Sequence, residues 1–138
     1  MGGFGALRLA GKFTTRFAAA SAHSAITKFS QMRDFVEEPL SAFTALEEDR
    51  SVFDTLQRNH ARLPPFRFDC GLEDPLLSAN RALHAELIAA DIGHTYQEFP
   101  GAHAWDYWHT HLADICCFTP FSPIGLVRSQ SGKTRATG

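Results

Sequence analysis

The stretch from Phe66 to Leu77 constrains the fold of this chain more than any other part of the sequence. Its first four residues alternate apolar and polar side chains, which predicts a strand. Gly71 then interrupts the pattern, and an acidic pair and Pro75 precede an amphipathic run that predicts a helix. In open α/β sheets, ligands and catalytic groups gather at the carboxyl ends of strands. Asp74 would lie at such an end.

Asp74 has two interpretations from this local pattern. An aspartate followed by proline is an ordinary helix N-cap with proline at the first helical position, and the local sequence favours this interpretation. The alternative is a carboxylate that orients a catalytic base at the strand end. Both remain open at this point.

The length and composition narrow the class of protein. A chain of 138 residues fits one domain or part of one, and is shorter than a complete doubly wound enzyme. The net charge of -2 and the lack of a basic, aromatic-rich run argue against a nucleic-acid partner. Three cysteines without paired spacing suit a reducing compartment, so a cytoplasmic location is expected. No apolar run approaches the roughly 20 residues that span a membrane.

The first 33 residues contain basic but no acidic residues, as organelle transit peptides do. Gly2, Gly3 and Gly5 disfavour that alternative, because they weaken an independent amphipathic helix.

Strand and helix patterns alternate along the chain. This order predicts right-handed crossovers and an α/β fold with a parallel sheet. Small apolar residues favour a strand buried on both faces at residues 16–25. The expected elements are a helix at 5–12, strands at 16–25, 66–69 and 95–99, and helices at 75–90 and 104–118.

Residues 26–63 differ from their surroundings, because aromatic residues are spread among charged ones. We expect two or three short helices that end at Pro64 and Pro65. One interpretation is a helical excursion that covers the sheet edge. The other is a cap-like insertion in which Phe29, Met32 and Phe35 line an apolar acyl pocket. Residues 119–138 show no periodicity, and we expect a divergent, disordered tail there.

His103 is the candidate base. It lies in a Pro-Gly-Ala-His loop directly after a predicted strand, so it could reach the strand end that carries Asp74. A carboxylate bonded to one ring nitrogen fixes the tautomer and leaves the other nitrogen to act as a base. The alternative is a histidine that caps the last helix or packs under Trp105.

Other candidates are weaker. The remaining histidines lack metal-ligand spacing, so no metal and no cofactor are expected. Cys70 at a strand end could be a thiol nucleophile, although a buried free cysteine is the commoner case. No G-x-S-x-G sequence occurs, so a His–Asp pair would have no serine in this chain.

Three separated motifs together resemble a known family. They are residues 1–10 (MGGFGALRLA), 66–75 (FRFDCGLEDP) and 98–108 (EFPGAHAWDYW). They are similar to the esterase D and S-formylglutathione hydrolase-like esterases of the α/β-hydrolase fold, which include tributyrin esterases. The resemblance covers about residues 1–118 and corresponds to the C-terminal half of the family's domain. It implies about three parallel strands with flanking helices and a helical insertion at 26–63.

The resemblance also implies site roles. Asp74 matches the acid and His103 the base, which reverses the local preference for a capping role alone. The family's nucleophilic serine would fall immediately before Met1, whose backbone nitrogen would then be an oxyanion donor. The expected substrate of the parent enzyme is a small acyl ester.

Three functions are therefore carried forward. The first is a serine carboxylesterase or thioesterase, with negligible activity for this chain alone because the nucleophile and the N-terminal half are absent. The second is a non-catalytic remnant or a partner-dependent half-domain, whose unpaired sheet edge would favour self-association. The third is a thiol hydrolase that uses Cys70.

Overall fold

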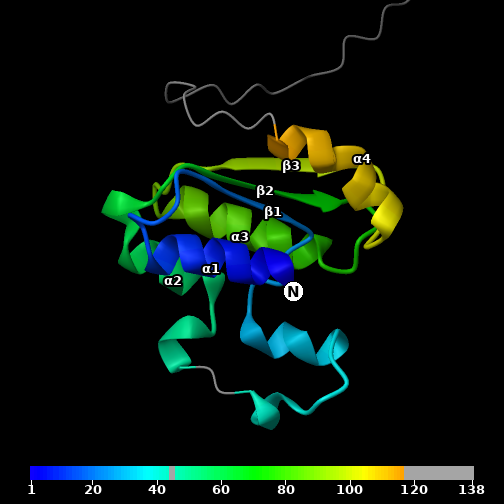
Figure 1. Ribbon diagram of the computed structural model, residues 1–138, viewed down its shortest axis with the longest axis horizontal. Coiled ribbons are helices and arrows are strands. Elements are labelled where there is room, and N and C mark those ends of the chain that lie inside the picture. The colour runs from blue at the N-terminus through cyan, green and yellow to red at the C-terminus, as the bar shows by residue number, and fades with distance from the viewer. Residues whose placement is uncertain (44–45, 117–138) are drawn as a thin grey trace, which may run out of the picture.

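The computed structural model describes residues 1–43 and 46–116 (Figure 1). Three parallel strands form one sheet in the order β1-β2-β3. The strands are β1 (Ala20–His23), β2 (Phe66–Gly71) and β3 (Thr95–Phe99). The predicted α/β class with about three parallel strands is confirmed.

Helices cover both faces of this sheet. The helices α1 (Gly2–Lys12), α2 (Val52–Arg58) and α3 (Leu77–Ala89) lie on one side, and α4 (Trp105–Cys116) lies on the other (Figure 1). The two parallel crossovers are long enough to contain helices, as parallel pairing requires. In such a sheet, functional side chains are expected on the loops that leave the carboxyl ends of β2 and β3.

The apolar core lies between the sheet and the layer of α1, α2 and α3. Because successive strand residues point to opposite faces, Phe66, Phe68 and Cys70 face this layer, whereas Arg67 and Asp69 face the side of α4. All six residues of β2 are buried, as expected for a central strand. The core side chains with the least exposure include Leu7, Val52, Leu56, Phe68, Leu83 and Leu87.

The first strand differs from its prediction. It has four residues rather than ten, and only one of them is fully buried, so burial on both faces was wrong for most of this segment. Ser24 adopts a positive φ of 45° directly after the strand, which ends the extended conformation. Since β1 pairs only with β2 among the described residues, its other edge is open.

The described part of residues 26–63 contains short 3₁₀ helices and one α-helix. Ser51 caps α2 by accepting a hydrogen bond from the backbone of Asp54, and α2 packs against α1 in the core layer. A Cβ on Gly11 would lie 3.1 Å from Leu56, so this glycine permits the close approach of α1 and α2. The first 3₁₀ segment projects away from the sheet (Figure 1). The 3₁₀ helices are η1 (Phe29–Asp34), η2 (Leu40–Ala42), η3 (Glu47–Asp49) and η4 (His60–Arg62).

Among the helices of the described part, none combines the length and apolar character needed to cross a bilayer. The tail predicted at 119–138, and the last two residues of the helix predicted at 104–118, lie outside the described residues.

Candidate active site

Asp74 and His103 are brought together at the carboxyl ends of neighbouring strands. Asp74 follows β2 and His103 follows β3, and their side chains form a hydrogen bond of 2.9 Å between Oδ2 and Nδ1. A carboxylate is an acceptor only, so Nδ1 carries the proton and Nε2 is the free basic nitrogen. The Asp74 carboxylate is fully buried, whereas the His103 side chain is 23% exposed. The pair can therefore accept a proton from a group outside the core.

The second carboxylate oxygen of Asp74 has a structural partner. Oδ1 accepts a hydrogen bond of 2.8 Å from the backbone of Leu76. The helix begins at Leu77, two residues later than predicted, because Pro75 and Leu76 form a turn before it. The interpretation of Asp74 as the helix N-cap is therefore wrong, because Leu76 holds that position and Pro75 precedes the helix. One oxygen of Asp74 instead orders the turn before α3, and the other binds His103.

Close backbone contacts set the position of the His103 loop. A Cβ on Gly71 would lie 2.1 Å from the carbonyl oxygen of Gly101, so only glycine fits at that point of β2. The same carbonyl accepts a hydrogen bond of 3.0 Å from the backbone of Glu73. The Glu73 carboxylate accepts in return from the Gly101 amide. Gly101 has a φ of 130°, a conformation that favours glycine.

Aromatic side chains surround the His103 ring. The ring of Phe35 lies 5.1 Å from it between centroids, and Trp108 meets it edge-on at 5.0 Å. Trp105 contacts Trp108 at 5.2 Å and is 82% exposed. The expected alternative in which His103 packs under Trp105 is therefore wrong, because Trp108 is the tryptophan that contacts it.

The predicted pocket residues divide between two places. Phe29 and Met32 line a cavity of about 340 Å³ that also contains Met1 and Phe4 at the start of α1. Phe35 instead contacts His103. The cavity thus lies where the resemblance places the residues after a nucleophile. Its role in acyl binding stays a prediction.

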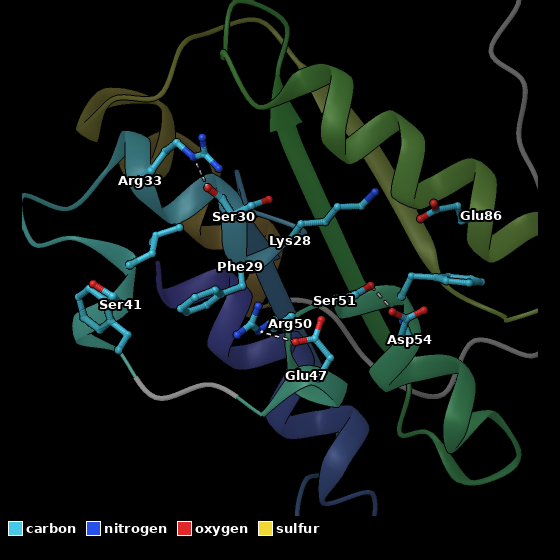
Figure 2. A pocket seen from close by; sticks show the side chains of 13 residues that line it. Lys28, Phe29, Ser30, Arg33, Ser41, Glu47, Arg50, Ser51, Asp54 and Glu86 are labelled. Atoms are coloured by element: carbon cyan, nitrogen blue, oxygen red, sulfur yellow. Dashed lines mark hydrogen bonds and ion pairs between the residues drawn. The ribbon is translucent and has the colours of Figure 1, made fainter.

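A larger cavity of about 750 Å³ lies between the insertion and the outer side of α2 and α3 (Figure 2). Neither Asp74 nor His103 lines it. Figure 2 shows Arg50 and Glu47 pointing toward each other, and they form an ion pair of 3.2 Å. Cationic and anionic side chains both line this cavity, so its charge selects no ligand class.

The sequence analysis missed a polar cluster around Asp69 on the side of α4. The carboxylate of Asp69 is fully buried and binds His23 Nδ1 at 2.6 Å, Tyr107 Oη at 2.7 Å and Arg67 at 3.1 Å. The available signal was the alternation of Arg67 and Asp69 in a strand predicted to be central. Two charged residues on one face of such a strand require buried partners.

The chain therefore contains two His–Asp pairs, and burial separates their possible roles. The His23 side chain is 12% exposed, and its Nε2 is buried without a hydrogen-bond partner. A ring nitrogen that neither solvent nor a bound molecule can reach cannot exchange a proton with a substrate. His103 is the histidine whose exposure fits a general base.

Cys70 does not fit the role of a nucleophile. Its side chain is fully buried. Burial, with a smaller contribution from the charge of Asp74, raises the pKa of this thiol to about 12. Because the thiolate is the reactive form, the thiol-hydrolase alternative is contradicted.

Within residues 1–43 and 46–116, no three His, Cys, Asp or Glu side chains are grouped so that they could hold a metal ion. His84 Nδ1 and His94 Nε2 lie 2.7 Å apart on the side of α3, but they form a hydrogen bond with each other. His94 also bonds to the carbonyl of Ile92, which leaves that ring without a free nitrogen.

The sequence was compared with models of known protein families, and one of them matches most of the chain. The model of the esterase family, described as "Putative esterase", matches residues 1–119. The chain belongs to this esterase family. A curated relative, an acetyl esterase from Caldicellulosiruptor saccharolyticus, is 26% identical over an alignment that covers 83% of this chain and 49% of the relative.

Solved structures support the fold of this esterase-family chain. An S-formylglutathione hydrolase, FrmB, from Staphylococcus aureus superposes with a TM-score of 0.73 at 21% identity, over 83% of this chain and 49% of that protein. A ferulic acid esterase superposes with a TM-score of 0.62 at 22% identity, over 83% and 46% of the two chains. The chain thus spans about half the length of these relatives. At this level of identity, the likeness to the solved structures shows the fold only.

Proposed function

We propose that this chain is the acid–base half of a serine carboxylesterase or thioesterase that hydrolyses small acyl esters. The observation that carries the proposal is the hydrogen bond between Asp74 and His103 at the carboxyl ends of β2 and β3. Family membership and the exposure of the His103 side chain support it.

In the proposed mechanism, His103 Nε2 takes the proton of the nucleophilic serine as that hydroxyl attacks the acyl carbonyl. Asp74 holds the ring by Nδ1 and stabilises the imidazolium that forms. The imidazolium then gives its proton to the leaving alcohol or thiol, and a water molecule releases the acyl group by the same route. By family resemblance the serine corresponds to the position immediately before Met1, and the Met1 backbone nitrogen to an oxyanion donor.

The cavity beside Met1 supports a short, apolar acyl group. Phe4, Phe29 and Met32 contribute apolar walls, and the two charged side chains of the lining, Arg8 and Asp49, form an ion pair with each other. The volume of about 340 Å³ is at the small end of ligand pockets. The acetyl esterase relative agrees with an acetyl or similarly short acyl group. We therefore propose p-nitrophenyl acetate and butyrate as test substrates.

The chain alone should have negligible esterase activity. Among the described residues, no serine, threonine or cysteine side chain is hydrogen-bonded to the His103 ring. Loss of the nucleophile alone lowers turnover by about 10⁶ in a serine protease with the same kind of triad. Ordinary turnover by the 138-residue chain that disappears in His103→Ala would contradict this expectation.

A chimera tests the catalytic roles directly. The part of the acetyl esterase that precedes the matched region would be fused in front of Met1, and hydrolysis of p-nitrophenyl acetate measured. We expect activity in the chimera, and a loss of at least about 10³-fold in His103→Ala and Asp74→Ala. His109→Ala is the matched control, because His109 is exposed on α4. An active chimera that tolerates His103→Ala would refute the proposed base.

The second candidate function is a non-catalytic or partner-dependent half-domain that also associates with itself. The observation that favours it is the open edge of β1, since an unpaired strand edge is a template for pairing. Size-exclusion chromatography with light scattering tests it. We expect concentration-dependent assembly, reduced by Ser21→Pro. This change removes a backbone N–H on the open edge, because the N–H groups of Ala20 and Ser24, on either side, point to β2. A monomer that melts cooperatively at all concentrations would contradict this candidate.

A further inference from the structure

The segment that carries His103 is held on two sides. The turn after β2 contacts it through Gly71 and Glu73, as described above. On the other side lies Tyr107 of α4, since a Cβ on Gly101 would approach the ring of Tyr107 to 2.7 Å. The Tyr107 ring therefore defines where the loop of His103 can run.

Tyr107 is itself fixed by one hydrogen bond. Its side chain is buried, and its hydroxyl donates to Asp69 Oδ1 at 2.7 Å. Burial, with the neighbouring Asp69 carboxylate, raises the pKa of Tyr107 above its usual value, so the hydroxyl remains a donor at neutral pH. The start of α4 is thus attached to the central strand of the sheet.

Asp69 is a rigid attachment point, because it is linked to β1 directly and to β3 through Arg67. His23 binds it from β1, and Arg67 binds it from β2. The same Arg67 nitrogen donates to Gln97 of β3 at 3.1 Å. A carboxylate with these partners cannot follow a movement of α4, so Tyr107 must keep its place or lose its hydrogen bond.

We propose that Asp69 is a positioning residue for the Asp74–His103 pair and that it acts through Tyr107. Its side-chain hydrogen bonds go to His23, Arg67 and Tyr107, and not to His103. The attachment of Tyr107 keeps Gly101 seated between the ring and the turn after β2, and this holds His103 Nδ1 at hydrogen-bonding distance from Asp74. The significance for catalysis rests on the function proposed above, but the geometric claim does not.

Tyrosine variants of the full chain test this coupling. The chain has two tyrosines, and both donate to a carboxylate. Tyr107→Phe keeps the ring against Gly101 and removes only the bond to Asp69. Tyr96→Phe is the matched control, because Tyr96 binds Glu98 and not Asp69.

The readout is nuclear magnetic resonance of ¹⁵N-histidine-labelled chain, with His103 assigned by loss of its signals in His103→Gln. We expect the Nδ1–H of His103 to exchange with water about tenfold faster in Tyr107→Phe, with altered ring nitrogen shifts, and no change in Tyr96→Phe. Unchanged His103 signals in a folded Tyr107→Phe chain would overturn the proposal. So would equal effects of the two tyrosine variants.

If Tyr107→Phe does not fold, amide hydrogen exchange of the unaltered chain tests the same coupling. The amides of Asp69 in β2 and Trp108 in α4 should open with rates that agree within about tenfold, because one bond joins their elements. Much faster exchange at Trp108 would overturn the proposal. An inactive chimera together with a positive tyrosine result would refute the esterase function and leave the positioning role intact.

Discussion

His103 Nδ1 lies 2.9 Å from Asp74 Oδ2, although 29 positions separate the two residues in the sequence. Parallel pairing of β2 and β3 produces this contact, because both strands end at the same edge of the sheet. The second oxygen of Asp74 binds the backbone of Leu76. The residue that orders the turn before α3 and the candidate catalytic acid are therefore the same side chain.

The two bonds of Asp74 can be separated by substitution. Asp74→Asn keeps an oxygen that can accept from Leu76, whereas Asp74→Ala removes both bonds. We expect Asp74→Ala to lower the free energy of unfolding by about 1 kcal/mol more than Asp74→Asn does. Urea denaturation measures this difference. Equal losses in the two variants would show that the bond to Leu76 contributes nothing to stability.

Gly71 should not tolerate a side chain. The Cβ of Gly71→Ala would meet the Gly101 carbonyl at 2.1 Å, and both backbones are fixed by hydrogen bonds. We expect a loss of about 1–3 kcal/mol in the free energy of unfolding, and altered His103 signals in nuclear magnetic resonance. Gly93→Ala is the control, since no atom lies within 4 Å of the added Cβ. Similar melting temperatures for the two variants would argue against the close approach.

Stability should depend on pH through His94. Burial lowers the pKa of His94 below its usual value, and the bond to the Ile92 carbonyl opposes this shift only in part. Below the usual histidine pKa of about 6.5, the unfolded chain binds a proton that the folded chain does not. The free energy of unfolding should therefore fall as the pH drops from about 6.5 through the folded pKa, by at most about 1.4 kcal/mol per pH unit for this proton.

Urea denaturation between about pH 7.5 and about pH 5 measures this slope. His94→Phe keeps an aromatic ring beside Phe66 and Phe68 and should flatten the dependence. His60→Phe is the control, because His60 is exposed. If His94→Phe retains the full slope of the original chain, the acid sensitivity has another origin.

Cys70 should be inert toward alkylation in the folded protein. With a pKa raised to about 12, the thiolate fraction at about pH 8 is negligible, and the sulfur is inaccessible. The variant Cys116→Ser/Cys117→Ser makes Cys70 the only thiol. Iodoacetamide labelling followed by mass spectrometry should detect modification only after denaturation. Rapid labelling of the native chain would restore the thiol-nucleophile hypothesis.

Several elements could be predicted from the sequence because local signals determine them. The alternation at residues 66–69 and the helical run after Pro75 predicted β2 and α3, although β2 continues through Gly71, where a break was expected. The loop after residues 95–99 made His103 a candidate partner for Asp74. These predictions succeeded because strand alternation and the start of a helical run are visible in the local sequence, and because parallel pairing brings the carboxyl ends of neighbouring strands to one edge of the sheet.

Only the tertiary structure decided the rest. The length of β1 depends on its single paired neighbour, which no local pattern reveals, and the alanine-rich run 16–25 is compatible with a longer strand. The Asp69 cluster joins residues from β1, β2 and α4, so His23 and Tyr107 carried no local signal for it. Burial also excluded Cys70 as a nucleophile, and the greater exposure of His103 made it, and not His23, the candidate base. The sequence alone determined which residues have the required chemistry, and packing determined which of them can reach a partner, because exposure and distance arise only when separate strands meet.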